Sequence, residues 1–202
     1  MIAVLDYGIG NLRSAEKALQ QVGAPAHLVA DPDEAAGADG IVLPGVGAFG
    51  ACAAALRASG LDAAVRGALE RGTPFLGICV GLQLLFEGSD EDPAAEGLGL
   101  LQGRVRPLPS GERRPQMQWN LVRRRSSSAL LGSSDEEWFY FVHSYVPEPS
   151  EAARGLVVGT CDYGEELPVA FEGERFFGTQ FHPEKSGRSG LALLGRFATL
   201  CA

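Results

Sequence analysis

The chain has 202 residues, of which 46% are hydrophobic and 21% charged, and this globular composition excludes a largely disordered protein. Its formal net charge of −8 argues against binding to the backbone of nucleic acids, which requires a basic surface. No apolar run reaches the roughly 18 residues of a membrane helix, and the first residues lack the features of a secretory signal. The four cysteines have neither zinc-ligand nor disulfide-framework spacing, so we expect a cytoplasmic protein with reduced thiols and no metal.

The first half of the chain alternates short apolar strands with helices. The expected strands cover residues 2–6, 26–30, 40–43 and 73–78. The expected helices cover residues 12–22, an Ala-rich stretch that breaks near Gly60 and ends at Arg71, and residues 79–86. Asn11 is expected to cap the first helix. This alternation predicts a mostly parallel central sheet with helices on both faces.

The second half of the chain is rich in strands separated by turns. The expected strands cover residues 105–107, 119–123, 138–144, 156–161, 168–172 and 175–181, and the last two form a hairpin around Gly173. A final amphipathic helix is expected over about 188–200, and residues 87–97 are expected to form a mobile loop. Because nothing resembles a linker, we expect a single α/β domain over residues 1–202, with an antiparallel, strand-rich second half.

The strongest chemical signal is Gly77-Ile78-Cys79-Val80-Gly81, which follows an apolar strand and precedes an apolar helix. This is the pattern of a nucleophile elbow with cysteine as the nucleophile. The glycines permit a sharp turn, and the start of a helix favours a thiolate at Cys79. The N–H of Val80 is then placed to donate to an oxyanion. The alternative is a buried, unreactive cysteine, which is the role expected of the other three cysteines.

A cysteine nucleophile needs a general base, and the chain has three histidines: His27, His143 and His182. His27 has no polar neighbours in the sequence, so we expect a core or surface role for it. His182 is followed by Glu184 at i+2, and in an extended chain both side chains point the same way. The carboxylate can then orient the imidazole beside Cys79, which predicts a Cys-His-Glu triad. The alternative is a chance pair with a local hydrogen bond.

Residues 45–50 match the Gly-x-Gly-x-x-Gly pattern of dinucleotide sites. They follow the third expected strand rather than the first, and Pro44 precedes them, so we discount a dinucleotide site. We interpret this segment as a loop whose backbone N–H groups face Cys79 and complete an oxyanion hole. A tight turn without a chemical role is the alternative.

Taken together, the motifs at residues 77–83 and 181–184 resemble those of the class I glutamine amidotransferases. Within that class, the chain is similar to the glutaminase subunits of imidazole glycerol phosphate synthase, which act in histidine biosynthesis. The stretches that carry this closer resemblance are Asp6–Ser14, Pro44–Gly50, Phe141–Tyr145 and Gln180–Ser186. They follow the family order over nearly the whole chain and are specific in combination.

The resemblance implies the flavodoxin-like fold of the class, no metal or organic cofactor, and hydrolysis of glutamine to glutamate and ammonia. Cys79 would attack the side-chain amide of glutamine and form a thioester that water then hydrolyses. His182, held by Glu184, would transfer the protons.

The resemblance also implies roles for the surrounding residues. Backbone donors of Val80, Val46 and Gly47 would stabilise the oxyanion. Gln83, one turn after the cysteine, would contact the substrate.

The partner implied by the resemblance is a separate (β/α)₈ cyclase subunit, which would receive the ammonia and make imidazole glycerol phosphate and aminoimidazole carboxamide ribotide. Met117, Trp119 and Asn120 stand where the family contacts this subunit. Gln116 and Gln118 depart from the usual His and Gly of that stretch. The family couples glutaminase activity to ligand on the cyclase, so we expect the isolated chain to be weakly active. The alternatives are a class I glutaminase of a different synthase and a non-catalytic binding protein with this fold.

Overall fold

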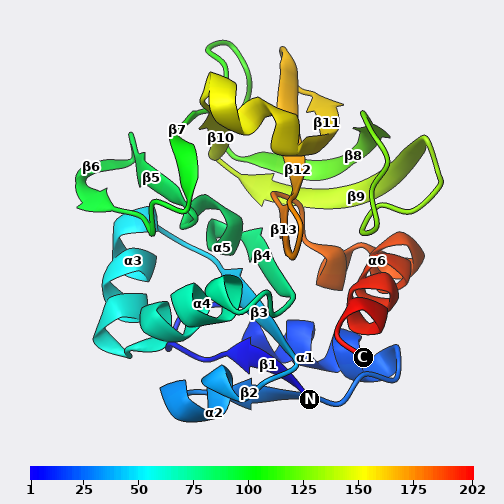
Figure 1. The fold of residues 1–202 in the computed structure, drawn as a ribbon. Coiled ribbons are helices and arrows are strands. Elements are labelled where there is room, and N and C mark those ends of the chain that lie inside the picture. The colour runs from blue at the N-terminus through cyan, green and yellow to red at the C-terminus, as the bar shows by residue number, and fades with distance from the viewer.

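The computed structural model describes residues 1–202 and contains a nine-stranded and a four-stranded sheet with six α-helices (Figure 1). The strands are β1 Ile2–Leu5, β2 Ala26–Val29, β3 Gly40–Gly45, β4 Phe75–Cys79, β5 Phe86–Ser89, β6 Asp92–Glu96, β7 Leu101–Pro107, β8 Gln116–Arg124, β9 Glu136–His143, β10 Tyr145–Pro149, β11 Val157–Asp162, β12 Glu166–Glu172 and β13 Phe176–Thr179. The helices are α1 Leu12–Gln21, α2 Pro32–Ala36, α3 Phe49–Ala58, α4 Leu61–Glu70, α5 Val80–Gln83 and α6 Gly187–Leu200. Two 3-10 helices, η1 and η2, cover Glu151–Leu156 and Pro183–Lys185.

The nine-stranded sheet runs through both halves of the chain in the order β2-β1-β3-β4-β13-β12-β11-β8-β9. The strand pairs from β2 to β13 are parallel, whereas those from β13 to β9 are antiparallel. The four-stranded sheet has the order β10-β7-β5-β6. The hairpin expected over residues 168–181 is present as β12 and β13. The predicted α/β fold with an antiparallel, strand-rich second half is therefore confirmed.

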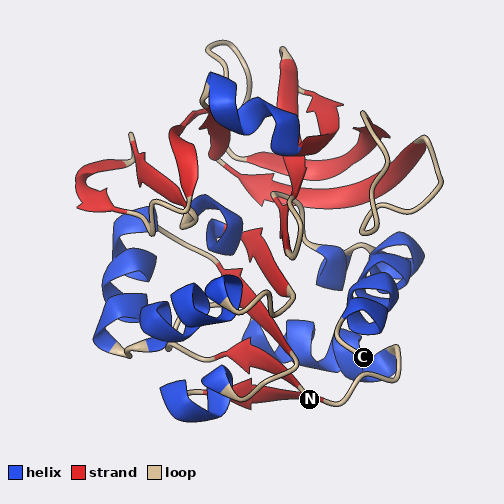
Figure 2. Cartoon of the chain, viewed as in Figure 1, coloured by secondary structure: helices blue, strands red, loops and turns tan.

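Helices cover both faces of the parallel strands, as the alternating pattern predicts (Figures 1 and 2). Helix α1 packs beside α6, and α3 packs beside α4. Leu19 of α1 and Phe197 of α6 are fully buried. Because both faces are covered, every residue of β1, β3 and β4 is buried, which explains their continuous apolar runs. No helix combines the length and the apolar character needed to span a membrane.

Two expectations for the middle of the chain are wrong. The helix expected over residues 79–86 ends at Gln83, and the loop expected over 87–97 contains strands β5 and β6. Phe86 is fully buried and pairs with Leu101 of β7. Pairing with a later strand therefore overrides the local helical pattern.

The short helix α2 is a further difference from the expected elements, although its start signal is present in the sequence. The side chain of Asp31 accepts hydrogen bonds from the backbone N–H groups of Asp33 and Glu34 at 2.8 and 3.1 Å. Pro32 follows as the first helical residue, where its fixed φ suits a helix.

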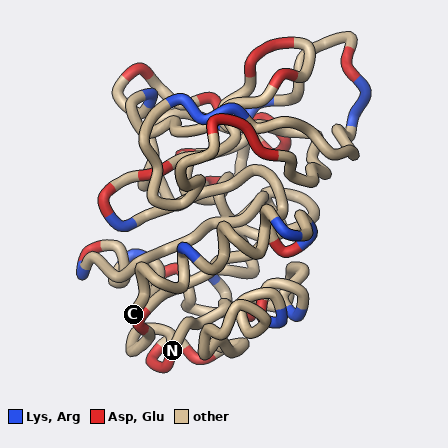
Figure 3. Tube along the Cα trace, turned by 90° about the vertical axis from the view of Figure 1, so that its right-hand side faces the viewer, with Lys and Arg blue, Asp and Glu red and all other residues tan.

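Acidic and basic residues are interspersed along the Cα trace in Figure 3. Several of them pair between strands or across turns, such as Arg124 with Asp135 at 2.7 Å and Arg125 with Glu166 at 3.3 Å. These pairs are solvent-exposed on at least one side, so each contributes little to stability.

Candidate active site

Cys79 lies at the junction of β4 and α5 in a strained turn. It is the only non-glycine residue with a positive φ, at 54°, and its exposed fraction is 3%. A Cβ atom at Gly81 would lie 1.8 Å from the carbonyl oxygen of Leu43, and one at Gly45 would lie 2.8 Å from the Gly81 nitrogen. Glycine is therefore required where neighbouring backbones meet around the cysteine. This is the geometry of a nucleophile elbow, in which the surrounding fold maintains the strain.

His182 and Glu184 follow strand β13 and form a buried pair. The Nδ1 atom of His182 lies 2.8 Å from Oε1 of Glu184, and each side chain is 1% exposed. The expected extended geometry is wrong, because Pro183–Lys185 form the 3-10 helix η2. A tight turn brings the carboxylate back to the imidazole, and the fixed φ of Pro183 suits that turn.

Asn11 has a different role from the expected helix cap. Its side chain makes no capping hydrogen bond to α1. Instead its Nδ2 donates to Oε1 of Glu184 at 3.1 Å, although 173 positions separate the two residues. The carboxylate oxygen that holds His182 therefore accepts two hydrogen bonds, while Oε2 of Glu184 is buried without a partner.

The electrostatics of this group favour an imidazolium beside the cysteine. Burial of His182 opposes its protonation, but interactions with the Cys79 sulfur and then with the Glu184 carboxylate outweigh burial and raise the pKa of His182 to about 10. Burial likewise opposes ionisation of Glu184, but hydrogen bonds from His182 and Asn11 hold the pKa of this carboxyl below its usual range. The Nε2 atom of His182 is buried and has no hydrogen-bond partner within the chain. The arrangement can therefore hold a positive charge beside the cysteine and shuttle a proton.

Of the three histidines, only His182 pairs with a carboxylate. His27 is exposed on β2. His143 is buried, its Nδ1 contacts the carbonyl of Tyr145 at 2.8 Å, and burial lowers its pKa to about 4. It is therefore neutral near pH 7, which leaves His182 as the histidine with the properties of a base.

A cavity of about 440 Å³ opens at Cys79. Its lining consists of Gly10, Asn11, Val46, Gly47, Cys79, Val142 and Lys185. Two of the predicted oxyanion residues, Val46 and Gly47, thus face the same space as the cysteine. Val80, the third, is the first residue of α5, where a backbone N–H has no partner within the helix. Because α5 contains only 4 residues, its dipole contributes little to the thiolate.

The glycine-rich loop before α3 is held by buried side chains. The hydroxyl of Tyr7 donates to the carbonyl of Pro44 at 2.7 Å, and the Cys52 thiol donates to the carbonyl of Val46 at 3.3 Å. The sequence motif signals neither contact, because both partners come from other elements. These two bonds therefore hold the segment at Pro44 and at Val46.

Gln83 is 3% exposed and does not line this cavity. Its Nε2 donates to the carbonyl of Tyr145 and to Oε1 of Gln180, both at 2.9 Å. Gln180 in turn places its Nε2 3.5 Å from the sulfur of Cys79. Sequence reasoning missed Gln180; its position two residues before His182 is the signal that could have found it.

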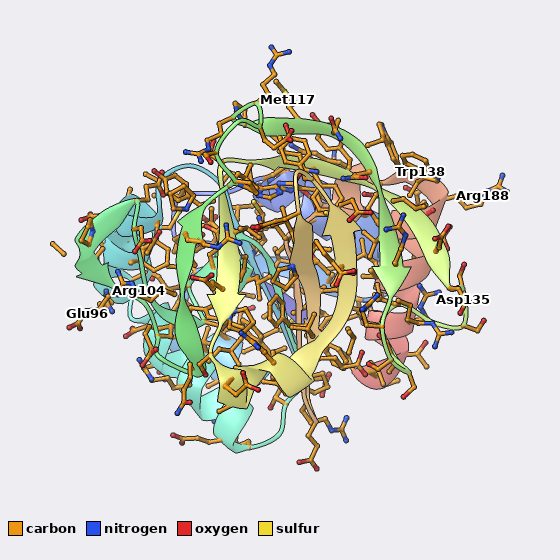
Figure 4. All side chains as sticks on the ribbon, turned by 90° about the horizontal axis from the view of Figure 1, so that it is seen from above. Glu96, Arg104, Met117, Asp135, Trp138 and Arg188 are labelled. Atoms are coloured by element: carbon orange, nitrogen blue, oxygen red, sulfur yellow. The ribbon has the colours of Figure 1, made fainter.

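The predicted partner residues lie on the antiparallel end of the sheet. Met117 is 61% exposed and Trp119 is 48% exposed, and both belong to one face of β8. Asn120 points to the opposite side of the strand, where its amide donates to the carbonyl of Asp162 at 2.9 Å. Trp138 of β9, which the sequence analysis did not select, is 55% exposed and lies on the same side of the molecule as Met117 (Figure 4).

This exposed face leads to the cavity. Met117 pairs with Val142, which lines the cavity, and Trp119 pairs with Tyr140 two residues earlier in β9. The rings of Trp119 and Tyr140 make an edge-on contact with centroids 6.1 Å apart. Residues at i and i+2 of a strand share a face, so the aromatic patch and the cavity mouth form one continuous surface.

The fold and the cysteine site together define a class I glutamine amidotransferase. The model of the family "Glutamine amidotransferase class-I" matches residues 3–199, so the chain belongs to this family. A solved structure described as a glutamine amidotransferase shares the fold, with a TM-score of 0.77 at 23% identity over 99% of this chain and 98% of that one.

Two curated relatives are more specific. The protein of Methanothermobacter thermautotrophicus is 47% identical over 99% of this chain and 98% of its own length, and that of Moorella thermoacetica is 49% identical over 98% and 94%. Both are named imidazole glycerol phosphate synthase subunit HisH. Within the class, the chain therefore belongs to the HisH subunits.

Proposed function

We propose that this chain hydrolyses glutamine to glutamate and ammonia and delivers the ammonia to a cyclase subunit of imidazole glycerol phosphate synthase, in histidine biosynthesis. The observation that carries the proposal is the buried pair of His182 and Glu184 beside Cys79, a cysteine that lines a cavity. Relatives with 47% and 49% identity that bear the HisH name support the choice of synthase.

In the proposed reaction the Cys79 thiolate attacks the side-chain amide carbon of glutamine. The resulting oxyanion accepts hydrogen bonds from backbone N–H groups of Val80 and of the loop at Val46 and Gly47. Ammonia leaves with a proton from the His182 imidazolium, and a thioester remains. His182 then takes a proton from water, which attacks the thioester and releases glutamate.

Gln83 is proposed to contact the substrate with the free end of its amide. Both hydrogens of its Nε2 are used by Tyr145 and Gln180, so only Oε1 is left for a ligand. The amino group of glutamine is a donor and suits this acceptor.

The proposed partner surface is the exposed face of β8 and β9 that carries Met117 and Trp119. Large apolar and aromatic side chains at this exposure are typical of interface cores. Since the face is continuous with the cavity mouth, a (β/α)₈ cyclase docked there would receive ammonia without its release to solvent. Asn120 would support this face from the opposite side of β8, where its amide donates a hydrogen bond to the carbonyl of Asp162.

We also propose that residues 1–202 act as a single domain and that the protein works in the cytoplasm. One sheet runs through both halves of the chain, which supports a single domain. All four cysteines are unpaired, which suits a reducing compartment.

The test is glutamate release from glutamine by the chain alone, with a purified cyclase subunit, and with the cyclase plus its nucleotide ligand. We expect slow release in the first two samples and a large rise in the third. Cys79→Ala should abolish the reaction, whereas Cys161→Ala, at a buried cysteine of β11, should retain it. No rise in any sample, with Cys79 still open to alkylation, would favour the glutaminase of a different synthase. A thiol that also resists alkylation in the complex would favour a non-catalytic binding protein.

A further inference from the structure

Gln180 has no assigned role in the reaction, yet its amide lies against the reacting sulfur. Its side chain is 0% exposed, and its Nε2 is 3.5 Å from Sγ of Cys79. We propose that Gln180 is a further catalytic residue, which donates an N–H to the Cys79 thiolate and also fixes the orientation of Gln83. This inference rests on the proposed function, in which Cys79 is the nucleophile.

The direction of these hydrogen bonds follows from one unambiguous acceptor. The backbone carbonyl of Tyr145 can only accept, so the Gln83 atom at 2.9 Å from it is the nitrogen. The same nitrogen lies 2.9 Å from the amide of Gln180, whose atom at that contact is therefore Oε1. The group that remains on Gln180 is Nε2, and it faces the sulfur as a donor. The network thus removes the usual ambiguity between amide oxygen and nitrogen.

A donor at this position matters because it makes the one side-chain hydrogen bond to the Cys79 sulfur. The helix after Cys79 has 4 residues, so its dipole is small. Cys79 as a whole is 3% exposed, so water also contributes little to stabilising a negative charge on its sulfur. In such surroundings a hydrogen bond to a charged acceptor is stronger than one between neutral groups. His182 supplies the positive charge, and Gln180 supplies a second, neutral donor.

The far end of the same network leaves an acceptor oxygen without a partner in the chain. The Oε1 atom of Gln83 accepts no hydrogen bond within the chain. It is not among the fully buried polar atoms that lack a partner, so it is accessible to a ligand. Rotation of the Gln83 amide would break its bonds to both Tyr145 and Gln180. Gln180 therefore holds an acceptor oxygen in place for the α-ammonium group of glutamine.

Two substitutions separate the two roles. Gln180→Met keeps the length of the side chain but removes both the donor to the sulfur and the acceptor for Gln83. Gln180→Glu retains an oxygen for Gln83 but presents an acceptor to the sulfur at pH 8. The matched control is Gln116→Met, at a glutamine of β8 that is also 0% exposed and whose amide has no hydrogen-bond partner.

The first readout is the pH dependence of Cys79 alkylation by iodoacetamide, followed by mass spectrometry of the Cys79 peptide. We expect the midpoint of this profile to rise by about one pH unit in Gln180→Met and by at least as much in Gln180→Glu, since a hydrogen bond to a charged group corresponds to about a tenfold effect. The second readout is steady-state glutaminase activity of the liganded complex. We expect kcat/KM to fall about tenfold in both variants, with KM raised only in Gln180→Met.

An alkylation profile and kcat/KM equal to wild type in both Gln180 variants would overturn the proposal, as would equal changes in Gln116→Met. If Gln180→Met fails to fold, Gln83→Met is the substitute, because it removes the hydrogen bond that orients the Gln180 amide. We expect it to raise the alkylation midpoint. Unchanged midpoints in Gln83→Met and in Gln180→Glu would overturn the proposal. Alkylation requires neither glutamine nor the partner. A midpoint that shifts in a complex unable to hydrolyse glutamine would therefore refute the proposed function while supporting the donor role.

Discussion

Asn11 holds the carboxylate that pairs with the imidazole of His182, the proposed general base, so Asn11→Ala should slow glutamine hydrolysis without unfolding the chain. Glu184 is 1% exposed, and its Oε1 accepts hydrogen bonds from His182 at 2.8 Å and from Asn11 at 3.1 Å. Without Asn11 one of the two bonds to a buried, charged oxygen is lost. Because Asn11 lies at the edge of the cavity and packs little apolar surface, the fold should survive the change.

The magnitude follows from the geometry of that bond. Hydrogen bonds to charged groups contribute about 1.5–3 kcal/mol. The distance of 3.1 Å is longer than the usual 2.7–2.9 Å of charge-assisted bonds, and the acceptor oxygen is shared, so we take the lower end. About 1.5 kcal/mol of lost positioning corresponds to a roughly tenfold fall in kcat/KM. The kcat/KM of Asn11→Asp should fall further, since this change replaces the donor by a second carboxylate beside Glu184.

The pH dependence gives a second, independent readout. The pKa of Glu184 is held below its usual range, so its carboxylate stabilises the fold above the pKa of the unfolded chain. This stability is lost as the pH falls through the lower folded pKa. Asn11→Ala brings the folded pKa closer to the unfolded value, so both the stabilisation and the acid limb of activity should be lost at a higher pH than in the wild type.

The assay is glutamate release by the liganded complex between pH 5 and pH 9, with thermal unfolding measured over the same range. Lys17→Ala is the control, because Lys17 is exposed on the same helix and forms no ion pair. A kcat/KM of Asn11→Ala within twofold of wild type and an unmoved acid limb would refute the reasoning. An equal loss in Lys17→Ala would show that the effect belongs to α1 as a whole.

Three further changes test the elbow, the partner surface and a buried histidine. Gly81→Ala should destabilise the chain by more than about 3 kcal/mol, because the new Cβ would lie 1.8 Å from the carbonyl oxygen of Leu43; denaturant unfolding measures this, and a midpoint equal to wild type would contradict the proposed packing of the turn. Trp119→Ala should leave the melting temperature within a few degrees of wild type, since the side chain is 48% exposed, but weaken binding to the cyclase at least tenfold by calorimetry; unchanged affinity would place the interface elsewhere. His143 has a pKa of about 4 in the folded chain against about 6.5 when unfolded, so the unfolded chain binds its proton first and stability falls between pH 6.5 and pH 4 by a few kcal/mol. Urea titrations should show a shallower acid slope for His143→Gln, and identical slopes would assign the acid loss to other groups.

Much of this protein could be predicted from local patterns. The glycines around Cys79 indicate a sharp turn, because only glycine tolerates backbone contacts as close as those at Gly81. The i+2 spacing places Glu184 within reach of His182 in either an extended strand or a tight turn, so the pair forms although the expected local geometry is wrong. The alternation of apolar runs with helical patterns similarly predicts the parallel half of the sheet.

Other features depend on contacts between distant segments. The bond from Asn11 to Glu184 spans 173 positions, and that from Gln83 to Gln180 spans 97. Asn11 has the sequence context of a helix cap, and nothing local indicates that its amide faces a carboxylate instead. Phe86 lies in a helical pattern but pairs with β7.

The physical reason is the range of the forces involved. Backbone sterics and the spacing of apolar side chains act over a few residues, so the elbow, the strand–helix alternation and the His-x-Glu pair follow from the local sequence. A buried polar group instead takes whichever partner the packed fold brings to it, because an unpaired donor or acceptor is costly wherever it lies in the chain. Insertion of β13 beside β4 places Gln180 and His182 next to Cys79, a placement that depends on the packing of segments about 100 residues apart.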